Sequence, residues 1–154
     1  MNAQPGEAAA DIPSGFKPLP IGGQFMAVNG PLYVRIADGR AQLGFRVAAR
    51  HTNPMDNCHG GMLASFGDML LPVCIHRQSA EVGLRFLPTI SLQIDYLAPA
   101  PLGAWVQGQA DVLRVTRTMV FAQGVAQADG APVMRVSGIF KIGQPFDRPV
   151  EAAG

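Results

Sequence analysis

One aspartate, two glycines and a short polar loop are the groups in this sequence whose spacing could support catalysis. Asp68 is the only charged residue between positions 62 and 75. Gly60 and Gly61 follow a polar loop at residues 51–59 and precede an apolar, helix-like pattern. A carboxylate can act as a general base or nucleophile, and open backbone amides at the start of a helix can stabilise an oxyanion. These residues therefore suit a reaction that passes through an oxyanion.

A helix at residues 59–77 is expected to position these groups, because apolar residues recur there every three or four positions. The apolar stripe consists of Met62, Leu63, Phe66, Met69, Leu70, Val73 and Cys74. Pro72 should kink this helix or strain its last turns. Asp68 lies roughly 190° from the centre of the stripe. Its neighbours on that face are Ala64, Leu71 and Ile75. Asp68 is then either a solvated surface carboxylate or a carboxylate on a covered, partly dry face, as at many catalytic sites.

The length of this helix argues for two chains at each site. Gly60 and Asp68 are separated by roughly 12 Å along a helix, whereas a base and an oxyanion donor must both lie about 3 Å from the reacting group. We therefore expect a homodimer in which antiparallel helices bring Asp68 of one chain to Gly60 of the other. The glycines also have a simpler reading, a tight turn into the helix that requires small residues.

The remaining sequence predicts an antiparallel sheet, because its segments alternate or are rich in β-branched residues. Strands are expected at residues 32–36, 41–48, 89–96, 104–115, 119–128 and 133–142. Asp38 and Gly39, and later Asp129 and Gly130, should form hairpin turns. One helix followed by several strands indicates an α+β fold with the helix on the sheet. Residues 1–20 are interpreted as a loose arm, residues 21–142 as the domain and residues 143–154 as a flexible tail.

Composition disfavours several functions. The chain of 154 residues is 48% apolar and 15% charged, with a formal net charge of +1. These values exclude a disordered chain and argue against a nucleic-acid partner. The N-terminus lacks a signal-peptide pattern, and no apolar run reaches the roughly 18 residues that span a bilayer. We therefore expect a cytoplasmic protein with no membrane partner. Its low charge suggests that part of the surface meets another subunit.

A motif of loop and helix residues carries a family resemblance. It consists of His51, Asn53, Pro54, His59, Gly60, Gly61 and Asp68, and similar segments extend over roughly residues 25–142. With this spacing the chain resembles the phenylacetate-pathway (PaaI-like) acyl-CoA thioesterases of the hotdog-fold superfamily. The resemblance implies a long antiparallel sheet wrapped around one central helix, in a homodimer or a homotetramer built as a dimer of dimers. It also implies hydrolysis of acyl-CoA or aryl-CoA thioesters with no cofactor, coenzyme A being part of the substrate.

The resemblance implies a role for each matching position. Asp68 would be the general base or nucleophile, and the Gly60 amide of the opposing subunit would polarise the thioester carbonyl. Asn53 would orient the thioester or water, His59 would support the loop, and Thr89 would place a hydroxyl near the water. Two simpler readings stay open, since His59 could merely pack in the loop and Asn53 suits an ordinary turn.

Arginines near a predicted strand connection are the candidates for binding coenzyme A phosphates. Arg114 and Arg117, with Thr118 beside them, lie between the strands expected at 104–115 and 119–128. An arginine guanidinium matches the geometry of a phosphate group. Solvated loop arginines are an equally good reading of the same residues.

Other readings of these residues are weaker. Cys58 beside His59 could suggest a nucleophilic pair, but adjacent loop side chains diverge and no third partner is evident. His51, Asp56 and His59 lack the spacing of a metal site, so no metal is expected. A hotdog enoyl-CoA hydratase would need Asp and His where His51 and Asp56 stand. A non-catalytic acyl-CoA-binding domain is the alternative from a different class.

Overall fold

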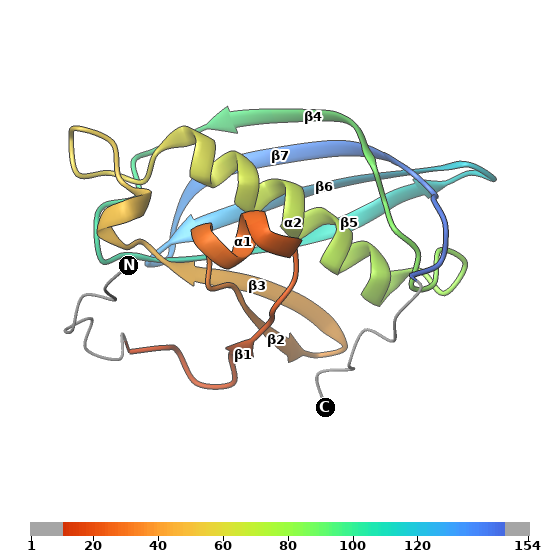
Figure 1. The fold of residues 1–154 in the computed structure, drawn as a ribbon, viewed down its shortest axis with the longest axis horizontal. Helices are drawn as coiled ribbons and strands as arrows, with labels where there is room; N and C mark the ends of the chain where they lie inside the picture. The colour runs from red at the N-terminus through yellow and green to blue at the C-terminus, as the bar shows by residue number, and fades with distance from the viewer. Residues whose placement is uncertain (1–10, 147–154) are drawn as a thin grey trace.

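A computed structural model describes residues 11–146, which form a seven-stranded antiparallel sheet curled around one long helix (Figure 1). The elements are β1 (Lys17–Pro18), α1 (Gly23–Asn29), β2 (Tyr33–Ala37), β3 (Arg40–Arg46), a 3-10 turn (Ala49–His51), α2 (Gly60–Gln78), β4 (Thr89–Tyr96), β5 (Trp105–Val115), β6 (Met119–Ala128) and β7 (Ala131–Lys141). The strand order is β1-β2-β3-β5-β6-β7-β4. The predicted α+β hotdog fold is thereby confirmed.

The predicted helix and strands are present with small shifts at their ends. The strands at 89–96 and 119–128 begin and end where the alternating pattern predicts, and the other predicted strand ends agree to within two residues. Both predicted turns have two successive residues with positive φ, at Asp38 and Gly39 and at Asp129 and Gly130. This geometry matches the right-handed twist of the hairpins that these turns close.

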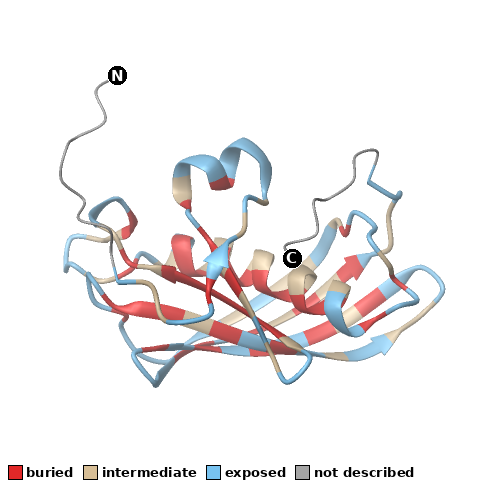
Figure 2. Ribbon diagram, turned by 90° about the horizontal axis from the view of Figure 1, so that it is seen from below, coloured by how far each residue is buried: buried red, intermediate tan, exposed pale blue. Residues whose placement is uncertain are grey.

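The concave face of the sheet buries α2 on more sides than its apolar stripe predicts. Phe66 and Leu70 are fully buried, as expected, but so are Leu71 and Ile75, which the sequence placed on the opposite face with Asp68. Both are buried within the single chain, whose sheet curls around the helix (Figure 2). Burying each of them contributes about 1.5–3 kcal/mol to folding. The expectation that this part of the face is covered by another subunit is therefore wrong for Leu71 and Ile75.

Two glycines allow the sheet to approach α2 closely on this side. A Cβ atom on Gly138 of β7 would lie 2.8 Å from Leu71 Cδ1, and one on Gly67 of α2 would lie 3.2 Å from Val136 Cγ2. The first distance is shorter than side-chain packing permits. The absence of side chains at these positions therefore fixes how tightly β7 wraps the helix.

Two short elements near the N-terminus were not predicted. β1 pairs with β2, and α1 lies across the outer side of α2 (Figure 1). Two glycines with positive φ, Gly22 and Gly23, lead into α1. The predicted arm and tail fall partly on residues 1–10 and 147–154, which lie outside the described residues. Within residues 11–146, none of the helices combines the length and apolar character needed to cross a bilayer.

Candidate active site

Asp68 lies at the surface of α2 that the sheet leaves open, and it lines a cavity of about 480 Å³. The side chain is half-buried. The walls of this cavity include Phe25 and Met26 of α1, Ser65 and Met69 of α2, and Thr89 of β4. A carboxylate in a mainly apolar hollow that is open to solvent can take a proton from water or attack a bound carbonyl. We name this hollow the Asp68 cavity.

Thr89 orients the Asp68 carboxylate. The Thr89 hydroxyl donates a hydrogen bond to Asp68 Oδ1 at 2.6 Å. Thr89 is the first residue of β4, so the start of this strand is fixed beside the middle of α2. With Oδ1 occupied, Oδ2 is the oxygen open to a reacting group. Two residues 21 positions apart, both singled out from the sequence, are therefore brought together.

The N-terminus of α2 presents one backbone amide, that of Gly60, with no partner among the described residues. His59 is the N-cap, and its Nδ1 accepts a hydrogen bond from the Gly61 N–H at 2.9 Å. Within the described residues the Gly60 N–H donates to no backbone or side-chain acceptor. An open amide at the positive end of a helix dipole is suited to bind a developing oxyanion. His59 caps the helix through its ring nitrogen, and its supporting role in catalysis stays a prediction.

Tyr96 holds Gly60 from the other side. Its hydroxyl donates to the Gly60 carbonyl at 2.8 Å, and a Cβ atom on Gly60 would lie 3.2 Å from Tyr96 Cζ. The carbonyl that Tyr96 binds belongs to the peptide group whose N–H is bonded to His59. Tyr96 and His59 therefore fix the first turn of α2 together, and Gly60 is packed where a larger residue would push against the tyrosine ring.

Asn53 shapes the loop that precedes α2. Its Oδ1 accepts hydrogen bonds from the backbone N–H groups of Met55 and Asn57, at 3.0 and 3.2 Å. This is the turn geometry expected of Asn before Pro54. The loop then returns through a backbone bond from the His59 N–H to the His51 carbonyl, at 2.7 Å. Asn53 thus lies in the loop that leads to Gly60, and its side-chain hydrogen bonds within residues 11–146 go to that loop and not to Asp68.

His51 is a structural residue in this loop. The ring is buried, its Nδ1 accepts from the Ala48 N–H at 3.0 Å, and its Nε2 donates to the Asn29 carbonyl at 2.6 Å. Both ring nitrogens are therefore occupied, and the imidazole connects the loop to the end of α1. Asp56, by contrast, is exposed. His51 and Asp56 therefore do not form the acid–base pair that an enoyl-CoA hydratase would need.

Gly60 and Asp68 lie on one unbroken helix, as the two-chain argument requires. They occupy the first and the ninth position of α2, which places them about 12 Å apart along the axis. A single chain therefore cannot put both groups around one carbonyl carbon. The predicted oxyanion donor, the Gly60 amide, lies at the start of the helix, and the predicted base, Asp68, lies near its middle.

The candidate phosphate contacts lie apart from the Asp68 cavity. Arg117 lines a hollow of about 310 Å³ at the connection between β5 and β6, where Arg85 and Glu81 also lie. This hollow and the Asp68 cavity share no residue. Arg114 and Thr118 are exposed beside it and are not part of its wall. Sequence reasoning missed Arg85, which is in an irregular segment with no spacing signal.

The cysteines do not form a nucleophilic site. Cys58 and Cys74 are both buried and unbridged. Burial raises the pKa of the Cys58 thiol to about 12 and that of Cys74 to about 11, so neither is a thiolate at neutral pH. In residues 11–146 no three His, Cys, Asp or Glu side chains are grouped closely enough to hold a metal ion.

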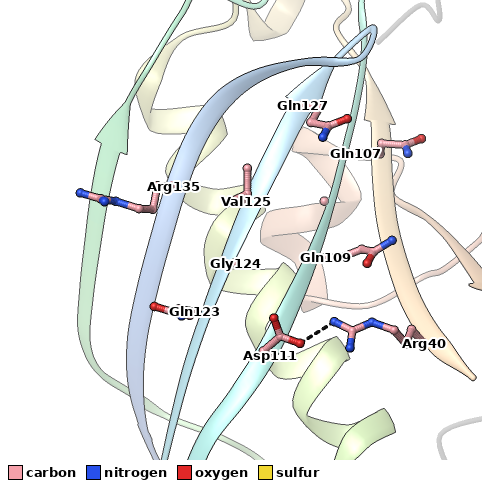
Figure 3. Close-up of a pocket in the computed structure, with 10 residues that line it drawn as sticks. Arg40, Gln107, Gln109, Asp111, Gln123, Gly124, Val125, Gln127 and Arg135 are labelled. Atoms are coloured by element: carbon pink, nitrogen blue, oxygen red, sulfur yellow. Dashed lines mark hydrogen bonds and ion pairs between the residues drawn. The ribbon is translucent and has the colours of Figure 1, made fainter.

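A larger hollow, of about 580 Å³, lies on the convex side of the sheet and contains none of the predicted site residues (Figure 3). Glutamines from β5 and β6 line it, with an ion pair between Arg40 and Asp111 at 2.5 Å. α2 passes behind the strands in this view. Size alone therefore does not locate the site, since the half-buried carboxylate and the open helix terminus are on the other side of the sheet.

Comparison with known proteins agrees with this arrangement. The family model of the thioesterase superfamily matches residues 55–132, just over half of the 154-residue chain. A Pseudomonas aeruginosa protein that is provisionally named an esterase is 26% identical over 136 residues, covering 86% of this chain and 98% of that protein. The matched family range includes α2, Thr89 and Tyr96.

Solved structures have the same fold. A variant of the phenylacetic acid degradation protein PaaI from Thermus thermophilus is 24% identical, with a TM-score of 0.64, and covers 76% of this chain and 96% of its own. A hypothetical thioesterase from Streptococcus pneumoniae, solved with coenzyme A, is 17% identical, with a TM-score of 0.65, and covers 80% and 98%. The expected membership in the thioesterase superfamily is confirmed by the family model, and the PaaI protein has the same fold. The chain therefore belongs to the thioesterase superfamily and has the hotdog fold of a thioester hydrolase.

Proposed function

We propose that this protein hydrolyses acyl-CoA or aryl-CoA thioesters, with Asp68 as the general base or nucleophile and the Gly60 amide of a second copy as the oxyanion donor. The observation that carries this proposal is the pairing of Asp68 with Thr89 in an open cavity. Membership in the thioesterase superfamily defines the class of bond that is broken. The coenzyme A bound to the fold relative from Streptococcus pneumoniae supports the choice of leaving group.

The general-base route uses groups that the chain supplies. Asp68 takes a proton from a water molecule held beside Thr89, and the water oxygen attacks the thioester carbonyl carbon. The carbonyl oxygen becomes an oxyanion that the Gly60 N–H stabilises. When the C–S bond breaks, the proton on Asp68 passes to the leaving sulfur, so the products are a carboxylic acid and coenzyme A with its thiol. Direct attack by Asp68 would instead form a mixed anhydride, which hydroxylamine would trap.

A homodimer with two composite sites follows from the distance between Asp68 and Gly60 along α2. Antiparallel copies of the helix would place each Asp68 beside the partner's Gly60. Exposed apolar side chains lie near both groups: Phe25 on α1 is 62% exposed, and Met55 in the loop before α2 is 78% exposed. Their burial would favour such a contact. A dimer of dimers remains the proposed larger assembly, and Arg114, Arg117 and Thr118 the proposed contacts for coenzyme A phosphates.

The test is release of free thiol from a panel of acyl- and aryl-CoA substrates, with Asp68→Asn beside the unmodified protein. The amide keeps the shape of the carboxylate and cannot accept the proton, so kcat should fall by about 10²- to 10⁴-fold. Asp111→Asn on the convex side of the sheet is the matched control. It breaks only an exposed ion pair, which water and salt screen, and should leave kcat unchanged.

Two results would contradict the proposal. Undiminished turnover in Asp68→Asn would remove Asp68 from the reaction. Tight binding of acyl-CoA without thiol release, by a protein that is folded and dimeric, would identify a non-catalytic acyl-CoA-binding domain instead.

A further inference from the structure

The side of α2 that the sheet leaves open forms a nearly uncharged strip on both sides of Asp68. Its half-buried residues are Ala64, Ser65, Asp68, Met69, Pro72, Val73 and His76. Asp68 is the only acid in the strip, and the next charged residue of the helix is Arg77. A helix face that meets water ordinarily carries several Lys, Glu or Arg residues. This strip therefore has the character of a binding surface for an apolar group.

A second cavity, of about 460 Å³, lies along the same strip one helical turn beyond the Asp68 cavity. Its apolar walls are Leu19, Ile21, Val34, Ile36, Val73 and Leu84. Lys17 and Arg77 also line it, and no Asp or Glu does. The walls come from the segment around β1, from β2 and from the loop after α2, so the N-terminal elements close one side of this hollow.

The two cavities are neighbours separated by a flexible side chain. Ile21 lines the second cavity and Gly22 lines the Asp68 cavity, while Val73 and Met69 have the same relation on α2. A Cβ atom on Gly22 would lie 3.3 Å from Met69 Sδ, so the thioether lies at the boundary. Methionine has three rotatable bonds and adapts readily to its surroundings. Met69 can therefore move aside to join the cavities into one groove.

The His76 side chain, at the far end of the groove, is uncharged. Burial lowers the pKa of His76, and its Nε2 donates to the Arg85 carbonyl at 2.8 Å. The ring is thus neutral at neutral pH. The Arg77 guanidinium is directed toward the Gly39 carbonyl, to which its Nε donates at 3.1 Å. The aliphatic stems of Arg77 and Lys17 are suited to cover an apolar chain while their charged ends remain in water.

Building on the thioester hydrolysis proposed above, we propose that the acyl chain of the substrate runs from Asp68 past Met69 into the second cavity, which makes medium- to long-chain acyl-CoA the preferred substrate. The stretch from Asp68 to His76 is about 12 Å of helix, and an extended chain advances about 3.5 Å every three bonds. Filling the groove therefore takes an acyl group of about ten carbons. Short acyl and aryl groups would fill only the Asp68 cavity.

The experiment measures kcat/KM for straight-chain acyl-CoA substrates from four to sixteen carbons. In the unmodified protein kcat/KM should rise with each added methylene, by up to about fourfold, until about ten carbons are reached. Val73→Phe fills the second cavity and should lower kcat/KM at least about tenfold for the twelve-carbon substrate, with the four-carbon value within about twofold. Val125→Phe makes the same change on the convex side of the sheet and should alter neither value.

A second variant keeps the groove assignment testable if Val73→Phe does not fold. A binding measurement keeps it testable if the proposed reaction does not occur. Ile36 is 49% exposed, so Ile36→Trp should be tolerated and should cause the same selective loss. Calorimetric titration with dodecanoate should detect binding to the unmodified protein and none to Val73→Phe. Binding of this kind without any thiol release would overturn the proposed hydrolysis and leave the groove assignment standing.

Three results would overturn the groove assignment. The first is a kcat/KM that does not increase beyond six carbons. The second is a Val73→Phe variant that loses short and long substrates equally or becomes monomeric, which would mean that a second copy of the chain covers the strip. The third is a folded protein that neither hydrolyses long-chain thioesters nor binds dodecanoate.

Discussion

The hydrogen bond from Thr89 to Asp68 fixes the one carboxylate that the open side of α2 carries. A carboxylate on a helix surface has several rotamers, and the bond at 2.6 Å selects one of them. The reacting oxygen is thereby oriented before substrate arrives. Orientation of this kind reduces the entropy that must be lost in the transition state.

Replacement of Thr89 tests this orientation. Thr89→Val keeps the size and shape of the side chain and removes the hydroxyl, so kcat should fall about tenfold, equivalent to about 1.4 kcal/mol. KM should change little, because the lost hydroxyl acts on Asp68. Thr89→Ser restores the hydroxyl and should recover most of kcat. A Thr89→Val variant with full kcat would show that Asp68 is oriented without this bond.

The site residues that the sequence revealed are those on a single helix or loop. Asp68 and Gly60 could be found because helical periodicity places them on known faces of α2. Tyr96 and Phe25 could not, although both lie at the site, because they reach it from separate elements through the tertiary fold. Thr89 was identified from the family resemblance alone, since a Thr at the start of a strand has no signal of its own.

Within α2, a proline is placed one turn after the carboxylate. Pro72 has no N–H, so the backbone carbonyl of Asp68, four residues earlier, has no helical donor. The helix continues to Gln78 despite this missing bond. An interior proline also crowds the carbonyl of the preceding turn, which predicts a local distortion of α2 beside Asp68.

Pro72→Ala should restore the missing bond and straighten the helix. The free energy of unfolding should rise by about 1–3 kcal/mol, which corresponds to a Tm increase of roughly 3–10 °C. Because a displacement of Asp68 by about 1 Å is costly to catalysis, kcat should fall by about tenfold or more. Thermal unfolding and thiol release on the same sample measure both effects, and Pro99→Ala is the control. A less stable Pro72→Ala would mean that the proline fits the helix without strain.

Elements with strong local patterns could be predicted, and short elements without such patterns could not. β4 alternates along its full length, and β6 ends at the Asp129 and Gly130 turn, so their bounds agree with the prediction. α1 has seven residues and no side-chain cap, which leaves little local signal. The burial of Leu71 was mispredicted, because a helical wheel does not reveal how far a sheet will curl around it.

At the scale of the whole molecule, the two halves of the site lie at different positions on one helix. The proposed reaction therefore needs two copies of the chain, and a dimer would contain two such sites. An alteration in one chain would then affect the site that it shares with its partner as well as its own. The activity of dimers formed from two different variants tests whether each site is shared between chains.

Two inactive variants should restore activity to each other. Gly60→Pro removes the N–H at the cost of a close contact with the Tyr96 ring. Proline suits the first helical position after His59, whose φ of −60° and ψ of 138° are extended. In dimers of Gly60→Pro and Asp68→Asn chains, one of the two sites keeps both groups. Random mixing should thus recover about a quarter of the unmodified activity. Thiol release after joint refolding measures it.

A matched mixture tests whether the two groups come from different chains. A chain that carries both changes, mixed with the unmodified chain, leaves no intact site in the mixed dimers if the groups come from opposite chains. The activity should then fall to about a quarter of that of unmodified dimers at the same total concentration. Retention of about half, together with no recovery in the first mixture, would place both groups in one chain.

Four of the six apolar walls of the second cavity come from a different part of the chain than the proposed reacting groups. Leu19, Ile21, Val34 and Ile36 precede residue 55, where the family match begins, whereas Asp68, Gly60 and Thr89 lie within the matched range, together with the walls Val73 and Leu84. The proposed recognition of the acyl tail would thus depend in part on a stretch of the gene that precedes the one for the proposed reacting groups. Recombination that replaces the residues before 55 with those of a relative should therefore change the preferred acyl-chain length. The proposed reacting groups would stay the same. An exchange of this kind, natural or engineered, would have its boundary near residue 55.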